Sequence, residues 1–362
     1  MNGVNVKKMS TKRIILTASL LLAAVLLLTV IGYVVYVLAD YSRIEDNEEL
    51  FVKNGSEAVA PAGEELKIIT YNIGFAAYTP EFSFFMDGGE YSRALSSKSV
   101  HGTMGGILDL LQNEDADFLM IEEVDQKATR SHYVDEKRIL VDELYGYDSV
   151  YAVNYDSAYL FYPLNSPHGK SLSGMLTFSR YNVTSSLRRS LPIETSLMKL
   201  VDLDRCYSVS RVPTDNGKEL VLYTVHLSAY TSDGTIATEQ LKMLISDMTA
   251  EYEKGNYIVC GGDFNKDLLG DSSEYFGISG EEYTWAQAFP TELLEGKGFS
   301  LVAASNAPTC RNADAPYHPE QFVLTVDGFI VSDNVTVVEY ETVDVGFKYS
   351  DHNPVSMTFI LN

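Results

Sequence analysis

The sequence predicts a mixed α/β domain of about 300 residues that follows a single membrane-spanning helix. Residues 14–39 form an uncharged and almost wholly apolar run. After it, short β-type runs alternate with segments of helical periodicity. The composition does not change again beyond residue 65, so we expect one folded domain rather than two.

The amino-terminal segment has the features of an uncleaved membrane anchor. An apolar run of this length, at about 1.5 Å per residue, is enough to cross a bilayer core of about 30 Å. A cleaved signal peptide, the alternative, has a shorter apolar core of roughly 7–15 residues. We therefore predict a basic cytoplasmic tail over residues 1–13 and a transmembrane anchor over residues 14–39.

Charge predicts the orientation of the anchor. The tail carries Lys7, Lys8, Lys12 and Arg13 and no acid, whereas residues 40–49 carry five acids. The positive-inside rule then places the tail in the cytoplasm and the domain outside it. Residues 40–64, which are acidic and polar, are expected to form a linker.

The net charge restricts the class of partner. The chain carries −23, and without the four tail cations the remainder carries −27. Such a domain repels polyphosphates at long range, which disfavours nonspecific binding of nucleic acid. A local site still binds phosphate when a cation bridges the like charges.

The domain elements follow from residue 65 onward. Apolar β-type runs predict strands at 66–71, 117–121, 174–180, 206–212 and 220–225, and helical spacing predicts helices near 107–111 and over 238–252. The aromatic segment 75–99 is expected to pack as a small satellite core, with base stacking or lipid contact as alternatives. The three cysteines are too few and too scattered for a disulfide framework or a zinc site.

The central stretch is residues 257–265, Tyr-Ile-Val-Cys-Gly-Gly-Asp-Phe-Asn. An apolar strand ends in two glycines that allow a sharp turn, and the turn presents Asp263 and Asn265. Polar residues recur in the same way at other strand ends, at Asn72, Glu123, His226, Asp327, Asp351 and His352. If these ends gather at one edge of packed sheets, their side chains would form a reactive site.

Six ordered motifs resemble those of the endonuclease/exonuclease/phosphatase superfamily, which has the DNase I-like fold. They are Thr70-Tyr71-Asn72, Ile121-Glu122-Glu123-Val124-Asp125, Thr224-Val225-His226-Leu227, Gly262-Asp263-Phe264-Asn265, Val326-Asp327-Gly328-Phe329-Ile330 and Ser350-Asp351-His352. The fourth matches the family signature without alteration. The second departs from the family pattern, because Glu122 stands where Gln is usual.

The resemblance implies an α+β fold over residues 65–362, a four-layer α/β/β/α sandwich that hydrolyses phosphoesters with a divalent cation. Mg2+ is the expected ion, with Mn2+ or Ca2+ as alternatives, held by Glu123 with Asn72 and Asp351. The implied catalytic residues are His226, Asp263, Asn265, Asp327 and His352. Of these, Asp263 would orient the attacking water and Asp327 would hold His352.

Three residues near the second motif have less definite roles. Glu122 is expected to lie at the surface, with an effect on metal affinity as the alternative. Arg130 and His132 are candidates for phosphate binding, although a charge in a loop is more often solvated.

The sequence leaves the substrate open. We expect a membrane-anchored phosphoesterase acting on a lipid headgroup, a small phosphoester or nucleic acid, because one catalytic centre serves all of these in the superfamily. A cell-surface nuclease is the first alternative, and a non-catalytic interaction domain that kept the fold is the second.

Overall fold

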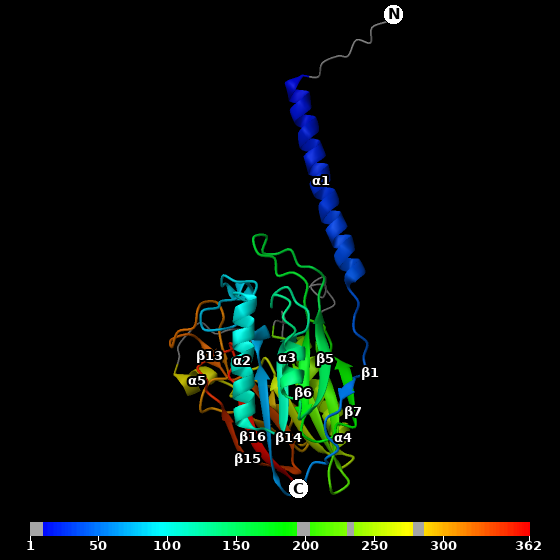
Figure 1. Ribbon diagram of the computed structural model, residues 1–362, viewed down its shortest axis with the longest axis vertical. Helices are drawn as coiled ribbons and strands as arrows, with labels where there is room; N and C mark the ends of the chain where they lie inside the picture. The colour runs from blue at the N-terminus through cyan, green and yellow to red at the C-terminus, as the bar shows by residue number, and fades with distance from the viewer. Residues whose placement is uncertain (1–9, 194–202, 230–234, 278–285) are drawn as a thin grey trace, which may run out of the picture. The chain divides into compact units, whose positions relative to one another are not determined.

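The computed structural model describes residues 10–193, 203–229, 235–277 and 286–362, and the chain divides into two units, residues 1–42 and 43–362 (Figure 1). The first unit is helix α1 (Thr11–Asp40). Its most apolar stretch has a mean hydropathy of 2.9, and the helix is long enough to cross a membrane. The predicted apolar span 14–39 therefore forms one helix.

The second unit contains two seven-stranded sheets. The first sheet has the order β15-β16-β3-β4-β6-β5-β2. Its strands are β2 (Val52–Lys53), β3 (Glu65–Asn72), β4 (Phe118–Asp125), β5 (Asp148–Asp156), β6 (Leu172–Ser179), β15 (Val335–Thr342) and β16 (Val355–Leu361).

The second sheet has the order β1-β7-β8-β9-β10-β14-β11. Its strands are β1 (Glu48–Glu49), β7 (Ser185–Ser190), β8 (Cys206–Pro213), β9 (Glu219–His226), β10 (Tyr257–Asp263), β11 (Phe299–Val302) and β14 (Asp327–Ser332). A separate ribbon pairs β12 (Cys310–Arg311) with β13 (Val323–Leu324).

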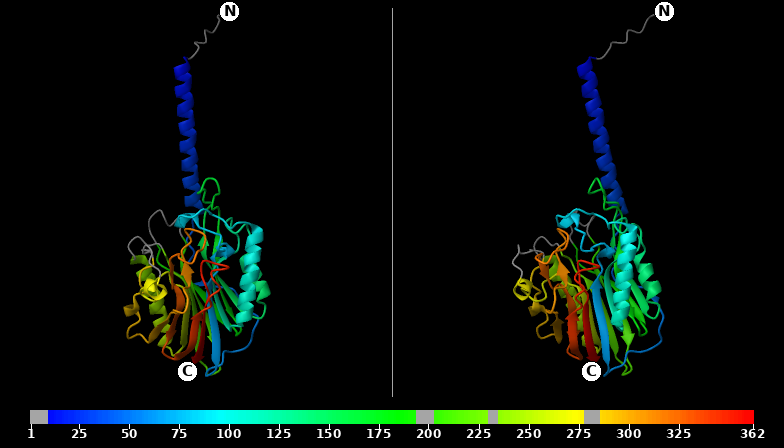
Figure 2. Two further views of the ribbon diagram at one scale, coloured as in Figure 1. Left: turned by 90° about the vertical axis from the view of Figure 1, so that its left-hand side faces the viewer. Right: turned by 60° about the vertical axis from the view of Figure 1, so that its left-hand side comes forward.

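Helices cover the outer faces of both sheets (Figure 2). The longer ones are α2 (Ser97–Glu114), α3 (Glu136–Glu143) and α4 (Thr235–Tyr252), and the short ones are α5 (Ser272–Phe276), η1 (Gly74–Ala76), η2 (Phe85–Asp87) and η4 (Thr291–Leu293). Apolar side chains of α2 and α3 pack on β3, β4 and β6, and those of α4 pack on β8, β9 and β10. The predicted four-layer α/β/β/α sandwich is confirmed.

Side-chain alternation along the strands supplies the core between the sheets. In β3, Leu66 and Ile68 point into the space between the sheets, whereas Ile69 and Tyr71 pack beneath α2. The period of two places successive side chains on opposite faces, so a strand buried on both faces is apolar throughout. This explains why the central strands read as continuous apolar runs.

Residues 43–64 differ from the predicted linker, because part of this segment joins the sheets. Glu48–Glu49 pairs with β7, and Val52–Lys53 pairs with β5. The acids do not prevent this, since edge strands pair through the backbone and leave charged side chains at the surface. Only Tyr41 and Ser42 lie between the end of α1 and Arg43, the first residue of the second unit.

The aromatic segment 75–99 packs in the main core and not as the predicted small satellite core. Phe75, Tyr78 and Phe82 are buried and belong to the same core as α2 and α3. Their rings contact one another edge to face, with centroids 4.8 to 5.3 Å apart. The segment is therefore an extension of the core over the carboxyl end of β3.

Candidate active site

The predicted strand ends meet at one end of the two sheets. In the second sheet, His226 at the end of β9 is in register with Asp263 at the end of β10, and Asp263 is in register with Asp327. In the first sheet, β3 ends at Asn72, and its Nδ2 donates to Oδ2 of Asp263 across the sandwich at 3.1 Å. The structure thus brings residues from both sheets into one site.

Asp263 lies at the centre of this site. Its Oδ2 is 3.6 Å from Nε2 of His226 and 3.9 Å from Nε2 of His352, and its Oδ1 accepts from the Asn265 backbone N at 2.8 Å. Burial, followed by the nearby Asp327 carboxylate, raises the pKa of Asp263 to about 7. A carboxylate with this pKa can accept a proton near neutral pH.

Gly262 sets the backbone path that delivers Asp263. Its φ is +144°, and a Cβ built there would lie 1.9 Å from the Val225 carbonyl oxygen of the neighbouring strand. Only glycine fits such a close approach of two backbones. The second glycine of the central stretch is thus a requirement of β9–β10 pairing next to the site.

His352 is held by Asp327. Its Nδ1 lies 2.8 Å from Oδ2 of Asp327, and both side chains are buried. Burial alone disfavours imidazolium, but the Asp327 carboxylate and then Cys310 outweigh it and raise the pKa of His352 well above its ordinary value. The ring is therefore a charged donor whose Nε2 faces Asp263.

His226 has the opposite electrostatic character. Burial, reinforced by Arg205, holds the pKa of His226 well below its ordinary value. Among the described residues its buried Nδ1 has no hydrogen-bond partner. The two histidines thus present one neutral and one charged ring to the same carboxylate, and only the charged ring of His352 can act as an acid.

Arg205 is a site residue that sequence reasoning missed. It is buried, and its Nη1 approaches the His226 carbonyl oxygen at 3.4 Å. Nothing in the sequence marks it, because a single arginine before a strand is common and carries no spacing signal.

A bulge in β4 aims Glu123 at the site. The pairing of β4 with β6 shifts between Ile121 and Val124, and Glu123 adopts a φ of +54°. Such a bulge re-aims one side chain relative to its neighbours. The Glu123 carboxylate lies 3.5 Å from Asn72 Nδ2 and 3.9 Å from Arg130 Nη1, and burial raises its pKa.

Glu122 is not at the surface, and that expectation was wrong. Its side chain is fully buried, accepts from Thr70 Oγ1 at 3.0 Å, and has a pKa raised well above its ordinary value by burial. The same bulge is the reason, since Glu122 follows the strand alternation into the interior while Glu123 leaves it. A neutral carboxylic acid donates and accepts hydrogen bonds much as the expected Gln does.

Arg130 and His132 have protein partners. The Arg130 guanidinium donates to Asp125 at 2.9 Å and lies 3.9 Å from the centroid of the Phe75 ring. His132 Nε2 is 2.7 Å from the Ala94 carbonyl oxygen. Arg130 therefore pairs with carboxylates of the site. Phosphate binding by Arg130 or His132 stays a prediction.

Asn265 and Asp351 complete the set of predicted residues. Asn265 Nδ2 donates to the Leu227 carbonyl oxygen at 2.8 Å, which fixes the amide beside His226. Oδ1 of Asp351 is 3.2 Å from the Ser350 hydroxyl, which in turn donates to the Asn72 carbonyl oxygen at 2.8 Å. Asp351 therefore lies beside Asn72 in the first sheet.

The donor chemistry of the site fits a divalent cation. Carboxylates of Glu123, Asp263, Asp327 and Asp351 gather there, and Oδ1 of Asp327 is buried without a hydrogen-bond partner among the described residues. Asp263, Asp327 and His352 also offer ligand atoms that lie within 4.8 Å of one another. His352 Nδ1 already bonds to Asp327. The predicted ligand set of Glu123, Asn72 and Asp351, which offers hard oxygens, stays a prediction.

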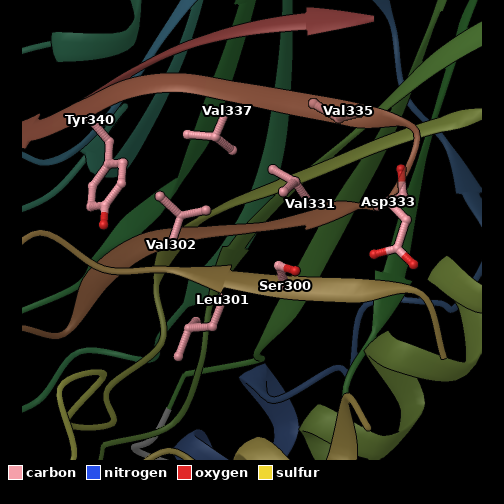
Figure 3. A pocket seen from close by; sticks show the side chains of 9 residues that line it. Ser300, Leu301, Val302, Val331, Asp333, Val335, Val337 and Tyr340 are labelled. Atoms are coloured by element: carbon pink, nitrogen blue, oxygen red, sulfur yellow. The ribbon is translucent and has the colours of Figure 1, made fainter. Parts of the chain in front are cut away.

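A groove of about 340 Å3 at an edge of the sandwich is distinct from this site. It lies between β11, β14 and β15, where Val302, Val331 and Val337 face one another (Figure 3). Its lining includes one acid, Asp333, and no histidine or cation. The groove therefore lacks the groups that phosphoester chemistry needs.

The fold and the site together define a two-sheet hydrolase with paired histidines and carboxylates at the strand ends. Residues 69–352 match the Endonuclease/Exonuclease/phosphatase family. The chain belongs to this family, as its motifs predicted. No curated protein matches the chain by sequence.

Solved structures share the fold at low sequence identity. An endonuclease/exonuclease/phosphatase from Beutenbergia cavernae superposes with a TM-score of 0.57 and 18% identity, covering 82% of this chain and 72% of that one. The human Nocturnin catalytic domain with bound sulfate gives 0.54 and 16%, covering 86% and 97%. ANGEL2, described as a 2′,3′-cyclic phosphatase, gives 0.53 and 16%, covering 87% and 99%.

Proposed function

We propose that this chain is a membrane-anchored, extracytoplasmic phosphoesterase that depends on Mg2+, with Mn2+ or Ca2+ as alternative ions. The observation that carries the proposal is the position of Asp263, within 3.9 Å of both His226 and His352 and bonded to Asn72. Family membership supports phosphoester hydrolysis as the reaction class. A non-catalytic interaction domain, the second class considered, has no need of this complete set.

The site residues have separate roles in an in-line displacement at phosphorus. Asp263, with its pKa of about 7, orients a water and accepts its proton as the new P–O bond forms. His352, held charged by Asp327, donates to the phosphoryl oxygens. The bond to the leaving oxygen breaks on the opposite side of phosphorus, and that oxygen takes a proton from solvent, while the neutral His226 ring donates a hydrogen bond to the phosphate.

The cation supplies charge neutralisation. Glu123, Asn72 and Asp351 would hold it, and a bound divalent ion stabilises the negative charge that grows on phosphoryl oxygens. Arg130 limits the repulsion at Glu123, because its guanidinium lies 3.9 Å from that carboxylate. This contact favours the charged form of Glu123, which is the form that binds a cation.

The proposed anchor and its orientation in the membrane are inferred from the first unit. The helix α1 has the length and hydropathy of a membrane span, and the cations that precede it favour a cytoplasmic amino terminus. The catalytic unit would then face the outside of the cell membrane.

The net charge of the domain is the first argument about the class of substrate. A net −27 after the anchor counts against a nuclease that grips a duplex through a basic groove. Nuclease action remains the second candidate, and the structural likeness to ANGEL2, a 2′,3′-cyclic phosphatase, supports a nucleotide-derived phosphoester. A lipid headgroup is our first candidate, because an anchored enzyme meets headgroups at high local concentration.

The test uses the full chain in detergent micelles. Bis-p-nitrophenyl phosphate, plasmid DNA, RNA and vesicles of sphingomyelin or phosphoinositide are assayed with Mg2+ and with EDTA. We expect turnover of the soluble diester that EDTA abolishes and that D263N lowers by at least about 100-fold. Absence of turnover of every substrate with Mg2+ would refute the enzyme, and cleavage of nucleic acid alone would favour the nuclease.

A further inference from the structure

Large apolar side chains project from two loops at the end of the second unit that carries the site. In the β5–β6 loop, Leu164 is 86% exposed and Tyr162 is 71% exposed. On η2, Met86 is 66% exposed. Single exposed apolar residues are ordinary, but these three lie on two loops that pack together. We call these three residues the apolar rim.

The rim rests on a defined base. The rings of Phe85 and Tyr162 lie 5.8 Å apart, so η2 and the β5–β6 loop pack directly together. His168 Nδ1 lies 3.0 Å from the Ser92 carbonyl oxygen, and Arg93 Nε donates to the Pro167 carbonyl oxygen at 2.5 Å. The rim side chains thus stand on aromatic and hydrogen-bonded contacts that hold the two loops in one arrangement.

The rim and the site share one end of the sandwich. The β5–β6 loop ends at β6, where Ser173 is in register with Asp125 and its hydroxyl accepts from Arg130 at 3.3 Å. Arg130 in turn contacts the Glu123 carboxylate. The other loop begins with η1 at Gly74, two residues after Asn72. Both loops therefore start from the sheet end that carries the ligands proposed for the cation.

The chain enters the second unit at this same end. Arg43 Nη1 lies 3.1 Å from Asp204 Oδ1, and the Ile44 backbone N donates to Oδ2 of the same carboxylate at 2.6 Å. The next residue, Arg205, contacts the His226 carbonyl oxygen. Tyr41 and Ser42, at about 3.5 Å each, connect Arg43 to the end of α1. The proposed anchor keeps the domain at the membrane, so lipid is a partner that it meets at high local concentration.

We propose that Met86, Tyr162 and Leu164 enter the surface of a zwitterionic lipid bilayer, which turns the site toward phosphoesters of lipid headgroups. The proposal rests on the membrane-anchored phosphoesterase proposed above. Apolar and aromatic tips gain free energy at the bilayer interface. The −27 charge of this part of the chain repels anionic lipid, which is why the surface is expected to be zwitterionic.

The binding test places a fluorescent label on the rim of the full chain. The native Cys206, Cys260 and Cys310 are buried, so an environment-sensitive dye attaches selectively to L164C. The chain is reconstituted into phosphatidylcholine vesicles that carry a lipid-borne quencher. We expect a blue-shifted emission and strong quenching. Vesicles doped with phosphatidylglycerol should give weaker quenching, and stronger quenching there would overturn the zwitterionic assignment.

Tyr145 supplies the matched control. It is 84% exposed, close to the 86% of Leu164, but it precedes the opposite end of β5, about 30 Å away along that strand. The dye on Y145C should show neither effect. Equal quenching at the two positions, or none at L164C, would overturn the proposed rim contact.

The activity test separates this proposal from the one before it. L164D should lower turnover of lipid phosphoester in phosphatidylcholine vesicles at least fivefold relative to turnover of soluble bis-p-nitrophenyl phosphate. An unchanged ratio overturns the functional consequence of the rim. Failure of the wild-type chain to cleave the soluble diester refutes the phosphoesterase instead, and leaves the quenching result to decide membrane contact.

Discussion

The Nδ1 atom of His352 lies 2.8 Å from Oδ2 of Asp327, and both side chains are buried beside Asp263. This contact fixes the ring orientation and leaves Nε2 facing the centre of the site. We expect H352A to lower kcat/KM for a soluble phosphodiester by about 100- to 10,000-fold. D327N should cause a smaller loss, because the ring keeps a neutral partner but loses the stabilisation of its charge.

His101 offers a control for that comparison. It is exposed on α2 and its Nδ1 lies 2.8 Å from the Ser97 carbonyl oxygen of its own helix, so H101A should retain full activity. Circular dichroism would establish that all three variants fold. Retention of more than a tenth of the wild-type kcat/KM by H352A would rule out its proposed role.

The bulge at Glu123 predicts a metal-affinity phenotype. E123Q keeps the shape of the side chain but removes the charge, so the Mg2+ concentration for half-maximal activity should rise on the order of tenfold or more. In EDTA the variant should be no less stable than wild type, because burial already disfavours the charged carboxylate.

Calorimetric titration with Mg2+ would measure the affinity of E123Q directly. Glu114 provides the control, since its side chain is about as exposed as that of Glu123 and pairs with Lys67 at 2.7 Å outside the site. E114Q should bind Mg2+ as wild type does. Equal affinities for wild type and E123Q would remove Glu123 from the proposed ligand set.

Arg130 predicts a large effect on stability. Its guanidinium bonds to the buried Asp125 and stacks on Phe75. R130A leaves the Asp125 carboxylate buried without its charged partner, which costs about 3–5 kcal/mol of unfolding free energy. R130K should recover only part of it, because an ammonium cannot reproduce the forked contact.

Urea denaturation would measure these free energies. The exposed Arg138, whose Nε lies 4.0 Å from Asp142 on α3, is the comparison, and R138A should change stability by less than about 1 kcal/mol. If R130A were as stable as R138A, the buried pair would not hold this part of the site together.

Much of the fold follows from the sequence because the strands are buried on both faces. Continuous apolar runs, such as that of β10, mark central strands, and the polar residue after each run marks the strand end. Parallel pairing of β9 with β10 then brings His226 and Asp263 together, as the motifs predicted. The histidine–carboxylate pairs are set by strand register, and register follows from hydrophobic pattern.

The features missed are those that depend on local departures from regular structure. The bulge in β4 reverses the expected exposure of Glu122, and no residue pattern in the sequence predicts this bulge. The edge pairings of Glu48–Glu49 and Val52–Lys53 are too short to show a period. Arg205 reaches the site only through the tertiary arrangement of β8 and β9. Each depends on three-dimensional neighbours that the sequence does not identify.

Glu251, far from the site on α4, predicts an acid-sensitive element of stability. Its carboxylate accepts from Arg211 at 2.6 Å and from Lys254 at 2.7 Å. Burial alone would raise its pKa, but these cations outweigh burial and lower the pKa to about 2. The folded value lies below the unfolded one, so the stabilisation is present above about pH 4.5 and is lost as pH falls toward 2.

The E251Q variant tests this linkage. We expect wild type to lose about 1 kcal/mol more than E251Q between about pH 6 and pH 3 in urea denaturation, since solvent screens the partly exposed cations. The exposed Glu239, which pairs with Lys242 at 2.8 Å, is the control, and E239Q should follow the wild-type pH dependence. Parallel pH dependences for wild type and E251Q would show that the Arg211 contact stabilises the fold without depending on the charge of Glu251.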